Sequence, residues 1–139
     1  MRTSLRVVRL GLMPRRRVLT ARDAFQILTP HARGLDRECF WRLDLDSRSG
    51  LLGCELVSMG SLDASIVHPR EVFKGALLNN ACKVMVAHNH PSLDPRPSGE
   101  DRQLTKRLTL AGFLLGVELV DHLVLAEERY FSFRQARLL

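Results

Sequence analysis

The sequence contains no apolar run that approaches about 18 residues, so it offers no candidate for a transmembrane helix and no membrane partner is expected. It also lacks Cys-x-x-Cys pairs, because its three cysteines, Cys39, Cys54 and Cys82, are widely spaced. This odd count excludes a disulfide scaffold and favours a reducing, cytoplasmic location. A composition of 45% hydrophobic and 26% charged residues over 139 positions excludes a disordered chain and indicates one globular domain.

Acidic residues are scarce at the N-terminus. Residues 1–37 contain nine arginines and two aspartates, a net charge of +7, whereas the whole chain carries +6, so the remainder nets −1. A domain that grips duplex DNA more often carries its basic residues on the body. We therefore interpret residues 1–19 as a basic N-terminal arm or strand ahead of a domain at 20–139. The favoured interpretation of its arginines is a solvated surface, and weak nucleic-acid binding through residues 1–37 is the alternative.

Residue patterns predict the first elements. Residues 6–10 form a short β candidate, and Thr20 with Asp23 indicates a helix start that runs to about Leu28, before Pro30. Residues 39–46 alternate with period two, and residues 51–59 form a return strand, so 39–59 is predicted to be a hairpin.

The second half of the chain alternates helices and strands. Proline at position 69 favours a helix over 69–78, and the apolar run 83–87 indicates a buried strand. Three prolines make residues 88–97 a loop, and strands are expected at 117–125 and 130–133. Between them an apolar repeat predicts a helix that ends at Gly112 or Gly116; its members are Leu104, Leu108, Ala111 and Leu115. The fold class is therefore α/β with a mixed sheet.

Candidate chemistry is concentrated at His88-Asn89-His90 and Asp101. In an extended chain residues i and i+2 point to the same side, so His88 and His90 face one point while Asn89 faces away. The loop brings Asp101 into the first turn of the next helix. Two imidazoles and a carboxylate suit Zn²⁺, and three protein ligands leave a fourth position for water, as in catalytic zinc sites.

Other interpretations of these residues stay open. Ser98 and Asp101 also fit an ordinary helix capping box, which is compatible with metal ligation. A hydrolase needs a base for the water proton, and the candidates are Glu55, Glu71, Glu100 and Glu118. Glu55 interrupts an apolar strand, where an acidic residue is costly unless it is paired or functional, although it could simply face outward. Isolated histidines such as His68 and His122 are more often packed side chains or loop residues than members of a site.

Two known zinc signatures are missing. The sequence has no His-Glu-x-x-His motif, which excludes the zincin type of metalloprotease. It also lacks His-x-Glu with a downstream Pro-Cys-x-x-Cys, the signature of the zinc deaminases.

The motifs together resemble the RadC family, a branch of the JAB/MPN (JAMM) metalloprotease superfamily. The similarity covers about Thr20 to Leu139 and is carried by the segments 67–73, 87–92, 97–101 and 121–122. It implies a cytidine-deaminase-like α/β/α sandwich with His88, His90 and Asp101 as Zn²⁺ ligands.

The resemblance also implies a function. Glu55 matches the upstream glutamate that activates water, and Ser98 matches the residue that steadies the tetrahedral intermediate. The implied activity is hydrolysis of an amide bond in a peptide or protein, such as the tail of a ubiquitin-like protein. The alternative is a DNA-associated accessory protein, in line with the DNA-repair label of the family, with a non-catalytic metal site.

The sequence departs from the family pattern in two ways. Leu93 stands where the family has glycine, and a left-handed backbone there would cost a leucine about 1 kcal/mol or more. Longer family members carry an N-terminal helix-hairpin-helix domain, for which this chain is too short, so we expect a stand-alone form.

Overall fold

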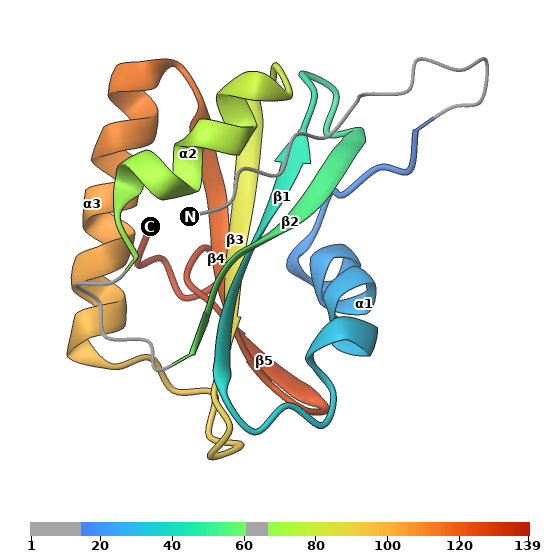
Figure 1. Ribbon diagram of the computed structural model, residues 1–139, viewed down its shortest axis with the longest axis vertical. Coiled ribbons are helices and arrows are strands. Elements are labelled where there is room, and N and C mark those ends of the chain that lie inside the picture. Colours follow the sequence, from blue (N-terminus) through green and yellow to red (C-terminus); the bar gives the residue numbers. More distant parts are fainter. Residues whose placement is uncertain (1–14, 61–66) are drawn as a thin grey trace.

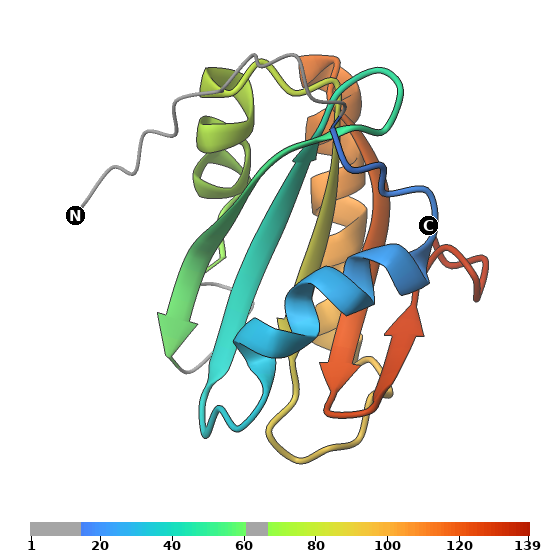
Figure 2. The same cartoon turned by 90° about the vertical axis from the view of Figure 1, so that its right-hand side faces the viewer.

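A five-stranded mixed sheet forms the centre of the computed structural model, which describes residues 15–60 and 67–139. The strand order is β2-β1-β3-β4-β5; β3 and β4 are parallel, and the other neighbouring strands are antiparallel. Helix α1 covers one face of the sheet, and α2 and α3 cover the other (Figures 1 and 2). The strands are β1 (Glu38–Leu45), β2 (Leu51–Gly60), β3 (Lys83–Asn89), β4 (Glu118–Ala126) and β5 (Arg129–Ser132); the helices are α1 (Ala21–Ala32), α2 (Pro69–Leu78) and α3 (Gly99–Leu115). The α/β class with a mixed sheet is confirmed.

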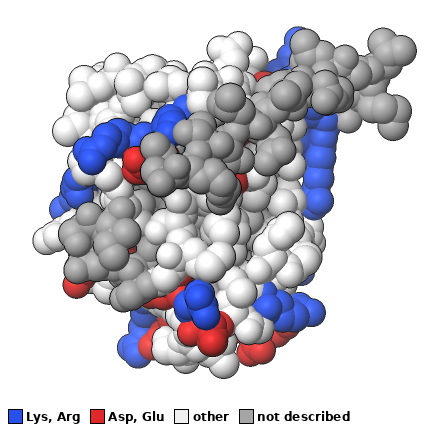
Figure 3. Space-filling view, viewed as in Figure 1, with Lys and Arg blue, Asp and Glu red and all other residues white. Residues whose placement is uncertain are grey.

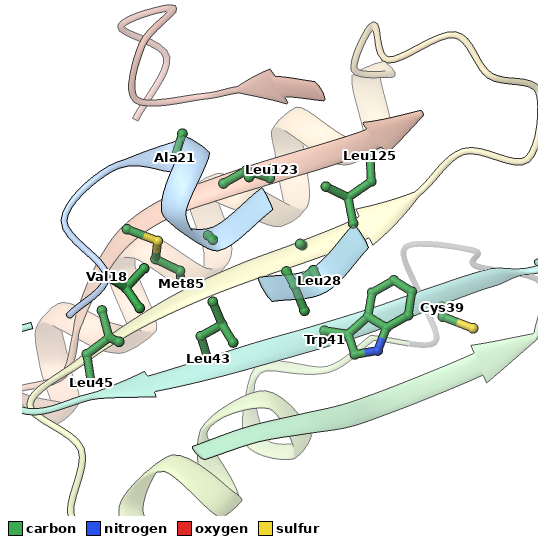
Figure 4. Close-up of a cluster of buried hydrophobic side chains, with 12 residues drawn as sticks. Val18, Ala21, Leu28, Cys39, Trp41, Leu43, Leu45, Met85, Leu123 and Leu125 are labelled. Atoms are coloured by element: carbon green, nitrogen blue, oxygen red, sulfur yellow. The ribbon is translucent and has the colours of Figure 1, made fainter. Parts of the chain in front are cut away.

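The predicted hairpin is present as β1 and β2, and the alternation in β1 divides its side chains between two cores. Trp41, Leu43 and Leu45 pack beneath α1, as Figure 4 shows, whereas Phe40 packs beneath α2 and α3. Both faces of β1 are therefore buried, which places Arg42 inside the α2 side of the molecule with no exposed surface.

Two boundaries differ from the predictions by more than one residue. Helix α1 continues past Leu28 to Ala32 and contains Pro30 in its last turn. A proline removes only its own N–H, and the turn is held because the Arg33 N–H donates to the Thr29 carbonyl at 3.0 Å. Strand β3 continues past Ala87 to Asn89, so His88 lies inside the strand rather than in the loop.

Helix α3 ends at Gly116, whose φ of 75° is the left-handed conformation of a C-terminal cap. The predicted apolar stripe is wrong at its C-terminal end, because Leu115 is 47% exposed. The side that faces the sheet instead carries Leu104, Thr105, Leu108 and Gly112.

The described part of the N-terminal arm contacts the domain. Val18 is buried in the α1 core, and Arg17 forms an isolated bridge with Gly50. The boundary after residue 19 stays a prediction, and the strand predicted at 6–10 lies outside the described residues.

The surface of the described residues carries charges of both signs. Basic and acidic side chains are intermixed at the lower end of the face in Figure 3. Among the described helices, none has the length and apolar character needed to cross a membrane.

Candidate metal centre

Three side chains converge where β3 leads into the following loop and α3. His88 is the second-last residue of β3, His90 follows the strand, and Asp101 lies in the first turn of α3. In Figure 1 this end of β3 lies near the bottom of the view, where the loop connects it to the start of α3. The sequence predicted this juxtaposition.

The three donor atoms lie close together. The Nε2 atoms of His88 and His90 are 3.1 Å apart, and each lies 3.2–3.3 Å from an Asp101 carboxylate oxygen. Ligands bound tetrahedrally at about 2.0–2.1 Å from Zn²⁺ are about 3.3–3.4 Å from one another. The donor set and its spacing therefore fit a zinc ion, and it is the only such group of three among residues 15–60 and 67–139.

Electrostatics favour the charged form of this cluster. Burial by itself would raise the pKa of Asp101, but hydrogen bonds from His88 and His90 hold that pKa well below its usual range. The hydrogen bond to Asp101 raises the pKa of His90 against the opposing effect of burial, helped by the Asp94 carbonyl and by the charges of Asp101 and Glu38. An anionic carboxylate beside two imidazoles attracts either protons or a metal cation.

Backbone groups orient two of the candidate ligands, His90 and Asp101. The Nδ1 of His90 lies 2.8 Å from the Asp94 carbonyl; because a carbonyl only accepts, Nδ1–H donates and Nε2 is left to face the cluster. Ser98 and Asp101 form the capping box that the sequence predicted: Ser98 Oγ accepts from the Asp101 N–H at 3.0 Å, and Asp101 Oδ2 accepts from the Ser98 N–H at 2.8 Å. The cap therefore fixes the Asp101 carboxylate through Oδ2 and leaves Oδ1 outside the capping box.

Asn89 points to the opposite side from its histidine neighbours, as expected. Its Oδ1 accepts from the Cys39 N–H at 2.6 Å, and its Nδ2 donates to the Arg37 carbonyl at 2.9 Å. The side chain thus ties the end of β3 to the start of β1.

Leu93 has a φ of 67°, so the position where the family has glycine does require a left-handed backbone. The Leu93 N–H donates to the His90 carbonyl at 3.0 Å, and the Leu93 carbonyl accepts from Arg129 at 2.8 Å. These contacts keep the turn in place despite the strain.

His122 lies directly behind the candidate ligand His88, a position that the sequence analysis did not favour. Its Nε2 is 2.9 Å from Nδ1 of His88, and the ring has no exposed surface. Burial lowers the pKa of His122 well below its usual value. The other doubtful histidine, His68, caps α2 by accepting from the Arg70 N–H at 3.2 Å and is not in the cluster.

Glu55 forms an ion pair with Arg42 at 2.8 Å. In the register of the sheet, Glu55 on β2 lies opposite Arg42 on β1. Arg42 in turn lies opposite Val86 on β3, two residues before His88. With strands about 4.8 Å apart and about 3.3 Å per residue, the Cα atoms of Glu55 and His88 are about 12 Å apart.

Glu38 is the carboxylate that the sequence analysis missed. Phe40 pairs with His88 in the antiparallel register, so the same register carried two residues further brings Glu38 opposite His90. Glu38 lies on the same face as Phe40, and its charge acts on the His90 imidazole. Strand pairing cannot be predicted from local patterns in the sequence. The only signal was that Glu38 lies two residues before Phe40 and therefore on the same face of the strand.

Comparison with known proteins agrees with this geometry. Residues 18–138 match the model of the RadC-like JAB domain. A UPF0758 protein of Methanosarcina acetivorans is 45% identical over 121 residues, which are 87% of this chain and 53% of the relative. A UPF0758 protein of Symbiobacterium thermophilum is 46% identical over 134 residues, 95% of this chain and 57% of the relative.

The chain spans about half the length of the curated relatives it matches. The match to the family model covers most of the chain, the mixed α/β sheet agrees with a JAB/MPN domain, and the cluster can hold a metal ion. This chain belongs to the RadC family and folds as its RadC-like JAB domain.

Proposed function

We propose that this chain is a zinc-dependent metallopeptidase-like or isopeptidase-like hydrolase of the JAMM type. The observation that carries the proposal is the convergence of His88, His90 and Asp101, whose donor atoms are 3.1–3.3 Å apart in adjacent pairs. A bound zinc ion would supply a Lewis acid that lowers the pKa of water toward about 7 and polarises a carbonyl.

Glu38 is our first candidate for the general base. Its support is the register opposite His90 and its electrostatic influence on that ring. A carboxylate there would accept a proton from the attacking water and return it to the departing amine, which balances the proton in amide hydrolysis. Glu55, which the family resemblance suggested, has Arg42 as its partner and is the second candidate.

Ser98 is a candidate for stabilising the developing oxyanion. Its Oγ already accepts a hydrogen bond from the Asp101 N–H, so its hydroxyl hydrogen can donate to a substrate oxygen. The substrate class we propose is an extended peptide or protein tail, such as the C-terminus of a ubiquitin-like protein.

The test is a matched pair of carboxamide variants assayed on the zinc-loaded protein with a panel of peptides and ubiquitin-like tails. Glu38→Gln should retain zinc and lose about 10²–10⁴ in rate, the usual contribution of general acid–base catalysis. Glu55→Gln removes a carboxylate from the Arg42 ion pair and should change the rate far less. The opposite ranking would return the role of base to Glu55, and equal activity of both variants and the wild type would contradict a carboxylate base.

The alternative function, DNA association through residues 1–37, stays a prediction. Four arginines of that region, Arg15, Arg17, Arg33 and Arg37, already contact groups of the domain or neighbouring residues. Non-specific binding should show a dissociation constant near 10⁻⁴–10⁻⁶ M at physiological salt and weaken steeply as salt rises. Deletion of residues 1–17 should abolish most of it; tight, unchanged binding by the truncated chain would contradict a role for the arm.

A further inference from the structure

A chain of hydrogen bonds leads from the back of His88 to the helix that carries Asp101. His88 Nδ1 lies 2.9 Å from His122 Nε2, and His122 Nδ1 lies 2.6 Å from Thr105 Oγ1. Thr105 Oγ1 in turn donates to the Asp101 carbonyl at 2.7 Å. The chain therefore begins at one candidate metal ligand and ends at the backbone of another.

The direction of this chain follows from its last member. A carbonyl has no hydrogen, so the Thr105 hydroxyl gives its only hydrogen to Asp101 and must accept from His122. His122 then carries hydrogen on Nδ1, and its Nε2 accepts. His88 consequently carries hydrogen on Nδ1, which leaves His88 Nε2 bare toward the metal position.

The reverse direction would spoil the ligand. If Thr105 donated to His122, the hydrogen of His122 would lie on Nε2 and point at His88 Nδ1. His88 would then carry its hydrogen on Nε2, where it faces Asp101 at 3.2 Å and blocks coordination. The bond between Thr105 and Asp101 joins residues i and i−4 of one helix, a contact that threonine makes readily, and it favours the first direction.

Packing holds this series of hydrogen bonds, which we call the relay, in place. The His122 ring stacks on Phe133 with centroids 4.8 Å apart and meets the edge of Phe40 at 5.9 Å. Thr105 is also buried, at 1% exposure. With no exposed surface on His122, the ring nitrogens depend on His88 and Thr105 as their partners.

We propose that His122 and Thr105 are positioning residues that select the Nδ1–H tautomer of His88 and aim its Nε2 at the metal. The inference rests on the proposed zinc site and adds two residues that do not touch the ion. Hydrogen bonds of this kind to a ligating histidine typically contribute 10–100-fold in metal affinity.

Two substitutions of His122 separate shape from hydrogen bonding. His122→Phe keeps a flat ring between Phe40 and Phe133 but removes both nitrogens, and should weaken zinc binding about 10–100-fold. His122→Gln offers one acceptor and one donor, so its affinity should lie between the Phe variant and the wild type. A glutamine variant as weak as the phenylalanine variant would argue against the hydrogen bonds and overturn the proposal.

Helix α3 supplies a matched control. Thr105→Val keeps the side-chain shape and removes the acceptor for His122, and should weaken zinc binding by up to about tenfold. Thr109 makes the same kind of bond one turn later, but its hydroxyl donates to the backbone carbonyl of Thr105 at 2.8 Å and leaves the Thr105 hydroxyl to His122 and Asp101. Thr109→Val should therefore bind zinc as the wild type does.

The readout is the zinc dissociation constant from competition with a chromophoric chelator, with urea unfolding as the check on folding. Equal affinities of folded His122→Phe and the wild type would overturn the proposal. If His122→Phe does not fold, the two threonine variants decide, and equal affinities for them would overturn it. Absence of zinc binding by the wild type would instead overturn the proposed function.

Imidazole ¹⁵N spectra of the zinc-loaded wild type give an independent signature. We expect hydrogen on Nδ1 in both His88 and His122. Hydrogen on Nε2 of His122 would contradict the direction of the relay, whatever the affinities.

Discussion

Two polar clusters, each built on a buried side chain of β1 or β3, lie on the same face of the sheet and differ in how their charges are matched. In the first, the Arg42 cluster, Arg42 bonds both oxygens of Asp44 and the Glu55 carboxylate. In the second, the metal-site triad, the Nε2 atoms of His88 and His90 and the carboxylate of Asp101 converge on one point. The first contains its own cation, and the second has room for one.

The Arg42 cluster is closed further by helix α2. Arg42 also donates to the Val72 carbonyl at 2.8 Å, and Asn79 donates to Asp44 at 2.7 Å. Gly75 permits this approach, since a Cβ there would collide with the Glu55 carboxylate and the Arg42 guanidinium. The comparison teaches that a buried charge identifies a binding site only when the fold leaves it without an internal partner of opposite sign.

The largest effect on stability should come from breaking the Arg42 cluster. Asp44→Asn leaves the fully buried Arg42 without its main counter-charge, and loss of one partner of a buried pair costs about 3–5 kcal/mol. The free energy of unfolding from urea titration measures this loss. Zinc affinity of the folded fraction should not change; a large loss of affinity would show that the clusters are coupled.

The equivalent change in the triad should have a large effect on zinc affinity and a small effect on the stability of the zinc-free protein. Asp101→Asn should weaken zinc by more than the 10–100-fold that supporting residues contribute, because it removes a ligand charge. Its effect on the zinc-free protein should be smaller than that of Asp44→Asn, since Asp101 is partly exposed and asparagine still accepts hydrogen bonds. Chelator competition and urea unfolding check both parts, and an unchanged zinc affinity would contradict the assignment of Asp101.

The pH dependence of zinc-free stability should depend on His122. Burial lowers its pKa, so its contribution to the free energy of unfolding is fully present above about pH 6.5. As the pH falls below that value, this contribution is lost by up to about 1.4 kcal/mol per pH unit. The raised pKa of His90 acts oppositely: its contribution is full below about pH 6.5 and is lost as pH rises through the folded-state value.

Urea unfolding of the zinc-free protein should therefore show a maximum near pH 6.5. Between pH 6.5 and 5 the wild type should lose stability, whereas His122→Gln should not. The lowered pKa of Asp101 keeps it ionised throughout this window, so it adds no slope there. A slope that persists in the variant would assign the loss to another group.

The smallest effect is expected at the strained turn. Leu93→Gly relieves a left-handed backbone that costs leucine about 1–2 kcal/mol, offset by about 0.4–1 kcal/mol of extra entropy in the unfolded chain. The variant should be up to about 1.6 kcal/mol more stable by urea unfolding. Ser92→Gly is the control, because Ser92 has no positive φ and should lose stability. A destabilised Leu93→Gly would show that the leucine side chain outweighs the strain.

Local signals in the sequence predicted most of the elements. The Thr20 and Ser98 caps, Pro69 and the hairpin turn all act through neighbouring residues, and the structure has an element at each. The convergence of His88, His90 and Asp101 was also predictable, because a strand end, a short loop and a helix start restrict their separation.

Features that depend on strand pairing were not predictable. The period-two alternation of residues 39–46 puts Arg42 on the same face as Phe40, but only the packing of α2 onto that face buries it. The positions of Glu38 and His122 follow from β1 and β4 lying on either side of β3, an order that no local pattern encodes.

The most direct test of the account is the zinc content of the purified chain, measured by native mass spectrometry before and after chelation. The wild type should carry one zinc ion per chain and lose it to the chelator. His88→Ala/His90→Ala should carry none while remaining folded, since both substitutions remove ligands of the triad. Full zinc retention by the double variant, or no zinc uptake by the wild type, would contradict the central claim.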